Sequence, residues 1–238
     1  MRACSLTLSL MLCCMASGCN SEKAASLEIE PLGPGPYSVG STNMEVSAEY
    51  ADIGDEAMHD FLLGLAEEPT KPRYIAGLLQ HPESAWVIDV PVPDEPELYG
   101  PASGQSMPLV TFVAYPATAR QEKNRYAFPY HDARYGVFED MLRAGETPSF
   151  ADPEDRYPLI ILAHGASAHG IYDIGHAHKL ASHGFIVAVI MYGDDRTSNT
   201  DNLNHHVSFL RPLLTKAVLD SLLQSDMFGA HIDTDNIG

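Results

Sequence analysis

Apolar and polar positions alternate in blocks through the last third of the chain. Two continuous apolar runs, YPLIILAH (157–164) and FIVAVIMY (185–192), predict strands that are covered on both faces of a sheet. Residues 171–184 and 211–226 carry apolar side chains at helical spacing, and the first of these segments stops at Gly184, a favoured helix end. The positions concerned are Ile171, Ile174, Ala177 and Leu180, then Leu214, Val218 and Leu222. Strand, helix, strand and helix in this order predict an α/β fold with a parallel sheet.

The first half of the chain has weaker patterns. The segment PLVTFVAYPA (108–117) is β-branched and aromatic and predicts a strand, and AWVIDV (85–90) predicts another. A loose alternation over residues 37–50 favours an early strand. Apolar residues at helical spacing predict short helices at 55–68 and 136–145. The intervening stretches are polar or rich in proline, which predicts loops and turns.

The N-terminal residues have the layout of an export signal. Arg2 precedes an apolar stretch at about residues 6–15, and small residues follow it. The stretch is too short to cross a bilayer as a permanent helix. Residues 1–18 are therefore predicted to be a signal peptide that is removed from the mature protein.

The end of this leader, ASGC (16–19), resembles a bacterial lipobox, with Ala16 where leucine is usual. The resemblance implies that Cys19 is lipidated and anchors an exported lipoprotein in a membrane, in the periplasm or at the cell surface. Ordinary secretion is the alternative. Residues 19–36 continue with polar, proline- and glycine-rich sequence, which is typical of a flexible tether. All four cysteines lie in the first 19 residues, so the mature chain can form no internal disulfide.

The charge balance narrows the range of partners. The chain has 32 Asp and Glu against 14 Lys and Arg, and its formal net charge at pH 7 is −18. Such an acidic surface repels nucleic acid, so we expect no nucleic-acid partner. The hydrophobic content of 45% is ordinary for a globular protein and is sufficient for a packed core.

Ser167 lies among small residues directly after the first apolar run, where many hydrolases carry a nucleophile. A nucleophile elbow requires the pattern G-x-S-x-G, because a strained strand-to-helix turn must expose the hydroxyl. The frame from Gly165 through Ser167 to Gly170 is one residue too long for this pattern. Ser106 and Ser182 each lack one of the two glycines. The sequence therefore assigns none of these serines as the nucleophile.

Histidines gather in the same region and raise the question of a metal site. The cluster consists of His164, His169, His176, His178 and His183. His176 and His178 are two residues apart, so on a helix they point in different directions. Catalytic zinc needs three convergent ligands, and the H-E-x-x-H motif is absent. We expect no metal here and interpret these histidines as solvated helix and loop residues.

Five segments occur in the order AYPA, YPLIILAHG, LASHGFIVAVIMY, RPLLTKAVLDSLL and IDTDNIG. Together they resemble the α/β-hydrolase fold, and within it the dienelactone-hydrolase-like and platelet-activating-factor acetylhydrolase-like esterases, over about residues 108–238. The resemblance implies a parallel, mixed sheet in which residues 37–238 form the N-terminal half of a hydrolase domain. In this family's order, IDTDNIG (232–238) is a turn that leads into a third parallel strand. That strand is expected to begin at Ile237, beside the one ending at Ala163.

In such esterases the buried strand, the HG pair and the loop after it build part of the oxyanion hole. The resemblance implies that Gly165 gives the close turn and that Ala166 supplies an N–H donor. His164 and Ser167 are implied to be neighbours of this loop, outside the catalytic triad. The family's chain order is serine, acid, histidine, so the nucleophile is expected beyond Gly238 and no histidine of this chain is the base.

The implied function is that of an exported serine hydrolase that cleaves carboxylic esters of small molecules or lipids without a cofactor. This chain, ending before the elbow, is expected to be inactive by itself. The alternative is a non-catalytic surface lipoprotein, a binding module derived from a hydrolase. Three further segments, at 124–138, 193–196 and 201–206, either face the substrate or are ordinary packing and loops.

Overall fold

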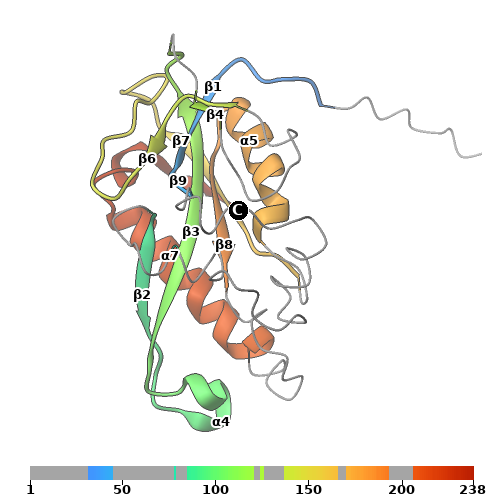
Figure 1. Ribbon diagram of the computed structural model, residues 1–238. Coiled ribbons are helices and arrows are strands. Elements are labelled where there is room, and N and C mark those ends of the chain that lie inside the picture. Colours follow the sequence, from blue (N-terminus) through green and yellow to red (C-terminus); the bar gives the residue numbers. More distant parts are fainter. Residues whose placement is uncertain are drawn as a thin grey trace, which may run out of the picture. The chain divides into compact units, whose positions relative to one another are not determined.

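A mixed sheet of seven strands forms the centre of the part of the chain that the structure describes (Figure 1). The computed structural model describes residues 32–44, 78, 85–120, 124–125, 137–165, 170–192 and 206–238. The strands of this sheet are β1 (Ser38–Thr42), β2 (Val87–Pro91), β3 (Ser106–Ala117), β6 (Met141–Leu142), β7 (Tyr157–Leu162), β8 (Ile186–Met191) and β9 (Ile232–Ile237). Their order is β6-β1-β3-β8-β7-β9, and β2 pairs with β3 outside this row. Strands β4 (Asn124–Arg125) and β5 (Val137–Phe138) form a separate sheet.

The parallel part of the sheet comes from the last third of the chain, as the apolar pattern predicted. Strand β7 pairs in parallel with both β8 and β9. Helix α5 (Ile174–Ser182) connects β7 to β8, and helix α7 (Arg211–Gln224) connects β8 to β9. Strand β3 pairs with β1, β2 and β8 in the antiparallel sense. The predicted α/β class is therefore confirmed, with a sheet that is mixed.

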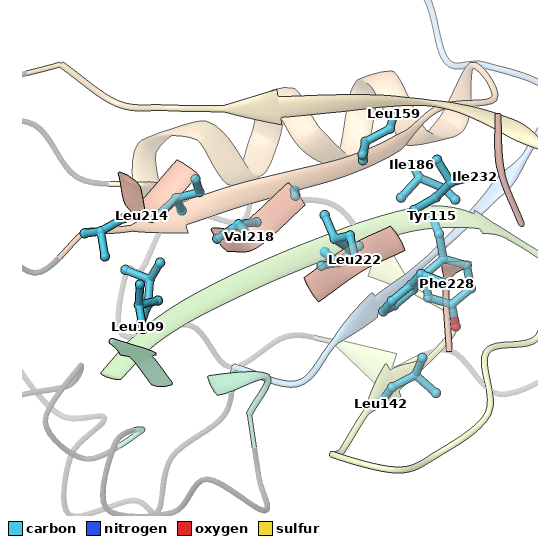
Figure 2. Packing of buried hydrophobic residues seen from close by; sticks show 14 of the residues in the cluster. Leu109, Tyr115, Leu142, Leu159, Ile186, Leu214, Val218, Leu222, Phe228 and Ile232 are labelled. Carbon is cyan, nitrogen blue, oxygen red and sulfur yellow. The ribbon is translucent and has the colours of Figure 1, made fainter. Parts of the chain in front are cut away.

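Alternate residues of β8 face two hydrophobic clusters, because successive side chains of a strand point to opposite faces. Ile186, Ala188 and Ile190 pack in the cluster that contains α7. Val187, Val189 and Met191 pack in the cluster that contains α5. The helix residues buried in these clusters include Leu214, Val218 and Leu222 of α7 (Figure 2) and Ile174, Ala177 and Ala181 of α5. The prediction that β8 is covered on both faces is confirmed.

Strand β7 is less buried than its continuous apolar sequence predicted. Tyr157 and Leu159 are buried, whereas Ile160, Ile161 and Leu162 are only partly buried. Ile160 and Leu162 border the cluster of α5, and Ile161 borders the cluster of α7. Both faces are therefore covered only in part, and β7 becomes more accessible towards its carboxyl end.

A short N-terminal segment, Gly35–Tyr37, is attached to the end of α5, and we call it the N-terminal strap. The N–H of Gly35 donates to Ser182 Oγ at 3.1 Å, and the N–H of Tyr37 donates to the Ser182 carbonyl at 3.0 Å. A Cβ at Gly35 would lie 1.8 Å from that carbonyl oxygen, so the close approach requires glycine. The helix ends at Ser182, two residues before the predicted stop at Gly184, whose φ is +97°.

The strap lies at the amino ends of β7 and β8. Ser182 is the last residue of α5, shortly before β8 begins at Ile186. The ring of Tyr37 meets the ring of Tyr157, the first residue of β7, edge-on at 6.3 Å between centroids. The described chain therefore enters the fold beside the amino ends of the parallel strands.

The described residues of segment 136–145 form β5 and β6, so the predicted short helix is wrong. Their backbone pairs with β1 and the residue after it: the N–H of Glu139 donates to the Val39 carbonyl at 2.7 Å, and the N–H of Asn43 donates to the Leu142 carbonyl at 2.6 Å. Phe138 packs in the cluster of α5, and Leu142 packs in the cluster of α7. Four residues apart, they would share one face of a helix, but here they lie on opposite faces of the sheet.

The acidic pair between these two strands, Glu139 and Asp140, is buried. Asp140 accepts a hydrogen bond from the Tyr115 hydroxyl at 2.9 Å and forms an ion pair with Arg120. Glu139 accepts a hydrogen bond from the Arg120 N–H at 2.9 Å. These partners compensate the cost of burying two carboxylates, which explains why an acidic sequence is tolerated inside the fold.

Strand β9 begins at Ile232, earlier than the predicted start at Ile237. Tyr157 pairs with Ile232, and the register then shifts so that Leu159 pairs with Ile237. The intervening residues turn around Asp233, whose carboxylate accepts from the Asp235 N–H at 3.1 Å and from the Asn236 amide at 2.7 Å. The predicted turn is thus a bulge inside the third parallel strand.

The strand predictions at 85–90 and 108–117 are confirmed by β2 and β3, and the one at 37–50 is confirmed by β1, with residues 45–50 outside the described part of the chain. Strands β2 and β3 continue into an arm whose end carries α4 (Pro96–Tyr99) and a 3-10 turn at Gly100–Ala102 (Figure 1). The helix predicted at 55–68 lies outside the described residues. Among the residues that are described, no helix has the length and apolar character needed to span a membrane.

Candidate active site

The carboxyl ends of β7 and β8 lie at the same edge of the sheet, because the two strands are parallel neighbours. Open α/β sheets bind their ligands at this edge. His164 and Gly165 follow β7, Tyr192 follows β8, and α7 begins beside them at Arg211. A cavity of about 600 Å³ opens there, lined by residues that include Ile161, His164, Gly165, Tyr192 and Arg211. Its wall is mainly apolar.

Arg211 connects the start of α7 to the end of β7. Its Nη1 donates a hydrogen bond to the His164 carbonyl at 2.6 Å, and its guanidinium carbon lies 4.7 Å from the centroid of the Tyr192 ring. Only 8% of Arg211 is exposed. A guanidinium stays charged when buried, so this hydrogen bond has an ionic donor and is stronger than a neutral one.

Tyr192 and Thr215 complete the arrangement. Thr215 Oγ1 donates to the Arg211 carbonyl at 2.8 Å, which uses the single hydroxyl hydrogen of the threonine. The Tyr192 hydroxyl, 2.6 Å from the same Oγ1, must therefore be the donor in that pair. The edge of the His164 ring also meets the Tyr192 ring at 5.2 Å between centroids. We call these four residues, His164, Tyr192, Arg211 and Thr215, the Arg211 clamp.

His164 has a defined role in the local backbone. Its Nδ1 lies 2.9 Å from the Gly165 carbonyl, and since a carbonyl only accepts, Nδ1 carries the hydrogen. The side chain is 6% exposed. The imidazole thus holds the backbone that follows it.

Gly165 is exposed at the mouth of the cavity. No described atom lies within 4 Å of the place where a Cβ would stand, so the backbone there is open to an approaching molecule. Ala166 and Ser167, and the lipidation candidate Cys19, lie outside the described residues. Their predicted roles stay predictions.

Ser182, which has one of the two glycines of the elbow pattern, has a structural role. Its hydroxyl donates to the Lys179 carbonyl at 2.7 Å and accepts the N–H of Gly35. Ser182 lies near the amino ends of β7 and β8, whereas the cavity lies at their carboxyl ends. Ser106 begins β3 on the arm and is exposed. The structure brings neither serine to the candidate site.

The described histidines have different surroundings. His176 is exposed, with Nδ1 3.3 Å from Asp173 Oδ1, while the His178 ring packs edge-on against Phe138 at 5.0 Å. His183 caps the end of α5, and His164 belongs to the Arg211 clamp. Within the described ranges, no group of three or more His, Cys, Asp or Glu side chains is arranged to hold a metal ion.

Sequence reasoning missed three members of the clamp: Tyr192, Arg211 and Thr215. The sequence carried a signal for two of these three residues. Tyr192 ends an apolar run, and Arg211 is a cation at the first position of an amphipathic helix. An N-terminal arginine is unfavourable to the helix dipole, so its presence there suggests a specific partner. That partner, the His164 carbonyl, is 47 residues away in the chain.

Comparison with known families shows what this chain is similar to. Residues 135–215 match the family model of platelet-activating factor acetylhydrolase, isoform II. This span is less than half of the chain, extends from β5 to the first turn of α7, and contains all four residues of the Arg211 clamp. A comparison with curated proteins found no significant match. The mixed α/β sheet is consistent with an α/β-hydrolase core.

Proposed function

We propose that this protein is a serine hydrolase that cleaves carboxylic esters and belongs to the platelet-activating factor acetylhydrolase isoform II family. The position of His164–Gly165 carries the proposal. The pair follows a parallel strand at the ligand-binding edge of an α/β sheet, borders a cavity, and lies inside the matched span. The fold and the match therefore support the same reaction class.

The chemistry requires donors for the oxygen that becomes negative when the ester carbonyl is attacked. Gly165 leaves its backbone open to a substrate, and we assign the next backbone N–H, that of Ala166, as one donor. A histidine-activated serine attacks the carbonyl carbon, the alcohol leaves, and water releases the acid from the acyl-enzyme. No serine of the 238 residues stands in G-x-S-x-G, so we assign the nucleophile to a serine outside them.

We also propose that the protein is exported and anchored through a lipidated Cys19. The N-terminal pattern supports this: a short apolar stretch follows Arg2 and ends in ASGC. The substrates would then be esters outside the cytoplasm. The family description names an acetylhydrolase, so esters with short acyl chains are the first to test.

The test is to express the full reading frame, read on past codon 238 where it is open, and to assay p-nitrophenyl acetate and p-nitrophenyl palmitate. A fluorophosphonate probe is then added, and the labelled serine is located by mass spectrometry. We expect turnover, and labelling of a serine within G-x-S-x-G. Heat-denatured protein is the control for nonspecific labelling.

Other outcomes would contradict the proposal in separate ways. Labelling of Ser167 would contradict the assignment of the nucleophile but keep the esterase. The absence of both turnover and labelling would contradict ester hydrolysis and favour the alternative, a non-catalytic surface lipoprotein that serves as a binding module.

A further inference from the structure

The Arg211 clamp joins three elements at the candidate site. His164 lies two residues after β7, Tyr192 lies directly after β8, and Arg211 and Thr215 lie one turn apart at the start of α7. The guanidinium of Arg211 is buried, and the His164 carbonyl and the face of the Tyr192 ring take the place of water around it. Both partners are electron-rich, so they suit a cation that has lost its hydration.

The clamp fixes the backbone immediately before the proposed oxyanion loop. A trans peptide unit is planar, and its C=O and N–H point in opposite directions. The hydrogen bond from Arg211 to the His164 carbonyl therefore orients the peptide unit that contains the Gly165 N–H. The hydrogen bond from His164 Nδ1 holds the Gly165 carbonyl. Strand β7 ends at Leu162, so side chains hold this backbone beyond the strand.

We infer that Arg211 is a positioning residue for the oxyanion hole. It acts through the His164 carbonyl and holds the peptide unit with the Gly165 N–H, which leads into the proposed oxyanion loop, in place before the substrate arrives. Donors that are already aimed stabilise the developing oxyanion without reorganisation. The inference rests on the proposed ester hydrolysis and adds to it a residue that the resemblance did not assign.

Lysine cannot fully replace arginine in this position. An ammonium group can donate to a carbonyl, but it lacks the plane that lies over the Tyr192 ring. We therefore expect Arg211→Lys to keep the hydrogen bond to His164 while holding it less rigidly. This variant separates the hydrogen bond from the loss of the whole side chain.

The first measurement is steady-state hydrolysis of p-nitrophenyl acetate by the product of the full reading frame. Arg211→Ala is expected to lower kcat by about 100-fold with KM unchanged, because a small misplacement of catalytic groups has an effect of this size. Arg211→Lys should fall between this variant and the wild type. Arg143→Ala, which removes an exposed arginine distant from the clamp, should leave both constants unchanged.

The second measurement observes the backbone directly. Protein labelled with carbonyl-¹³C histidine and ¹⁵N glycine gives peptide signals only from His–Gly pairs, which in these 238 residues are 164–165, 169–170 and 183–184. Gly165→Ala removes the first signal and so assigns it. Arg211→Ala is expected to shift the 164–165 signal and to leave the 183–184 signal, at the far end of α5, in place.

The outcomes distinguish the inference from the proposal on which it rests. An active wild type together with wild-type kcat in Arg211→Ala would overturn the inference alone, as would an increase in KM without a change in kcat. An inactive wild type would contradict ester hydrolysis itself. If Arg211→Ala does not fold, Arg211→Lys decides: wild-type kcat combined with a shifted 164–165 signal would overturn the positioning role.

Discussion

The hydroxyl of Tyr115 donates a buried hydrogen bond to Oδ2 of Asp140 over 2.9 Å, and this bond joins the long strand β3 to the edge of the sheet at β6. Arg120 forms an ion pair with the other oxygen of the same carboxylate. Strand β1 lies between them, and Gly40 of that strand leaves the space that the Tyr115 ring fills. The ring of Tyr115 therefore fits only because residue 40 is glycine, and its hydroxyl stabilises the buried carboxylate of Asp140.

Replacing Tyr115 with phenylalanine should change how stability depends on pH. Burial, followed by the nearby Asp140, raises the pKa of the Tyr115 hydroxyl far above its ordinary value of 10.0. Folding therefore favours the protonated phenol. This stabilisation is complete below pH 10 and is lost as the pH rises towards the folded pKa. Tyr115→Phe should show a shallower alkaline loss of unfolding free energy, measured by urea denaturation between pH 8 and about pH 11.

The same variant should be less stable at neutral pH, because Asp140 loses a donor while it stays buried. A hydrogen bond to a charged group contributes about 1.5–3 kcal/mol. Tyr99→Phe, at a partly exposed position on the arm, is the matched control and should stay near the wild type. Unchanged stability in Tyr115→Phe would mean that water or another group satisfies Asp140.

Gly40→Ala should destabilise the fold through a clash with Tyr115. A Cβ at this position would lie 2.4 Å from Cζ of the ring, closer than any van der Waals contact allows. The ring is anchored by Asp140, so it cannot move aside freely. We expect a loss of about 1–3 kcal/mol by thermal or urea unfolding. Gly165→Ala, where the space is open, should change stability by less than about 0.5 kcal/mol.

Two neighbouring leucines of α7 test how the helix is oriented. Leu222 is fully buried in the cluster shown in Figure 2, whereas Leu223 is 36% exposed. Leu222→Ala should lower the free energy of unfolding by about 2–5 kcal/mol because it leaves a cavity. Leu223→Ala should cost much less. Equal losses in the two variants would contradict the packing of this helix against the sheet.

Replacing Cys19 with serine tests the proposed anchor. Lipidation requires the sulfur of Cys19, which serine lacks. Each methylene of the acyl chains that is buried in the membrane then contributes about 0.8 kcal/mol to attachment. In a bacterial host, the wild-type protein should take up radioactive palmitate and sediment with membranes. Cys19→Ser should do neither. A wild-type protein released into the soluble exported fraction would instead favour ordinary secretion.

Strand β8 was predictable because burial alone decides its pattern. The six residues of β8 are all buried, so their apolar run could be read without knowledge of any partner. Segment 136–145 was not predictable in this way. Phe138, Met141 and Leu142 stand at helical spacing, but pairing with β1 decides their structure, and β1 lies about a hundred residues earlier in the chain.

Within the candidate site, the sequence predicted only the position of the backbone at His164 and Gly165. The HG pair after an apolar run indicated the position of His164 and Gly165. The Arg211 clamp depends on contacts between β7, β8 and α7, and no local spacing reports such contacts. The segment RPLL was part of the resemblance without a role for its arginine, and the structure shows that Arg211 donates to the carbonyl of His164.

The N-terminal strap attaches the chain to the fold at a point remote from the proposed ester site. The strap meets Ser182 and Tyr157 at the amino ends of β7 and β8, whereas the cavity lies at the carboxyl ends of the same strands. Loosening the strap should therefore lower the stability of the fold while leaving the chemistry of the proposed site unchanged.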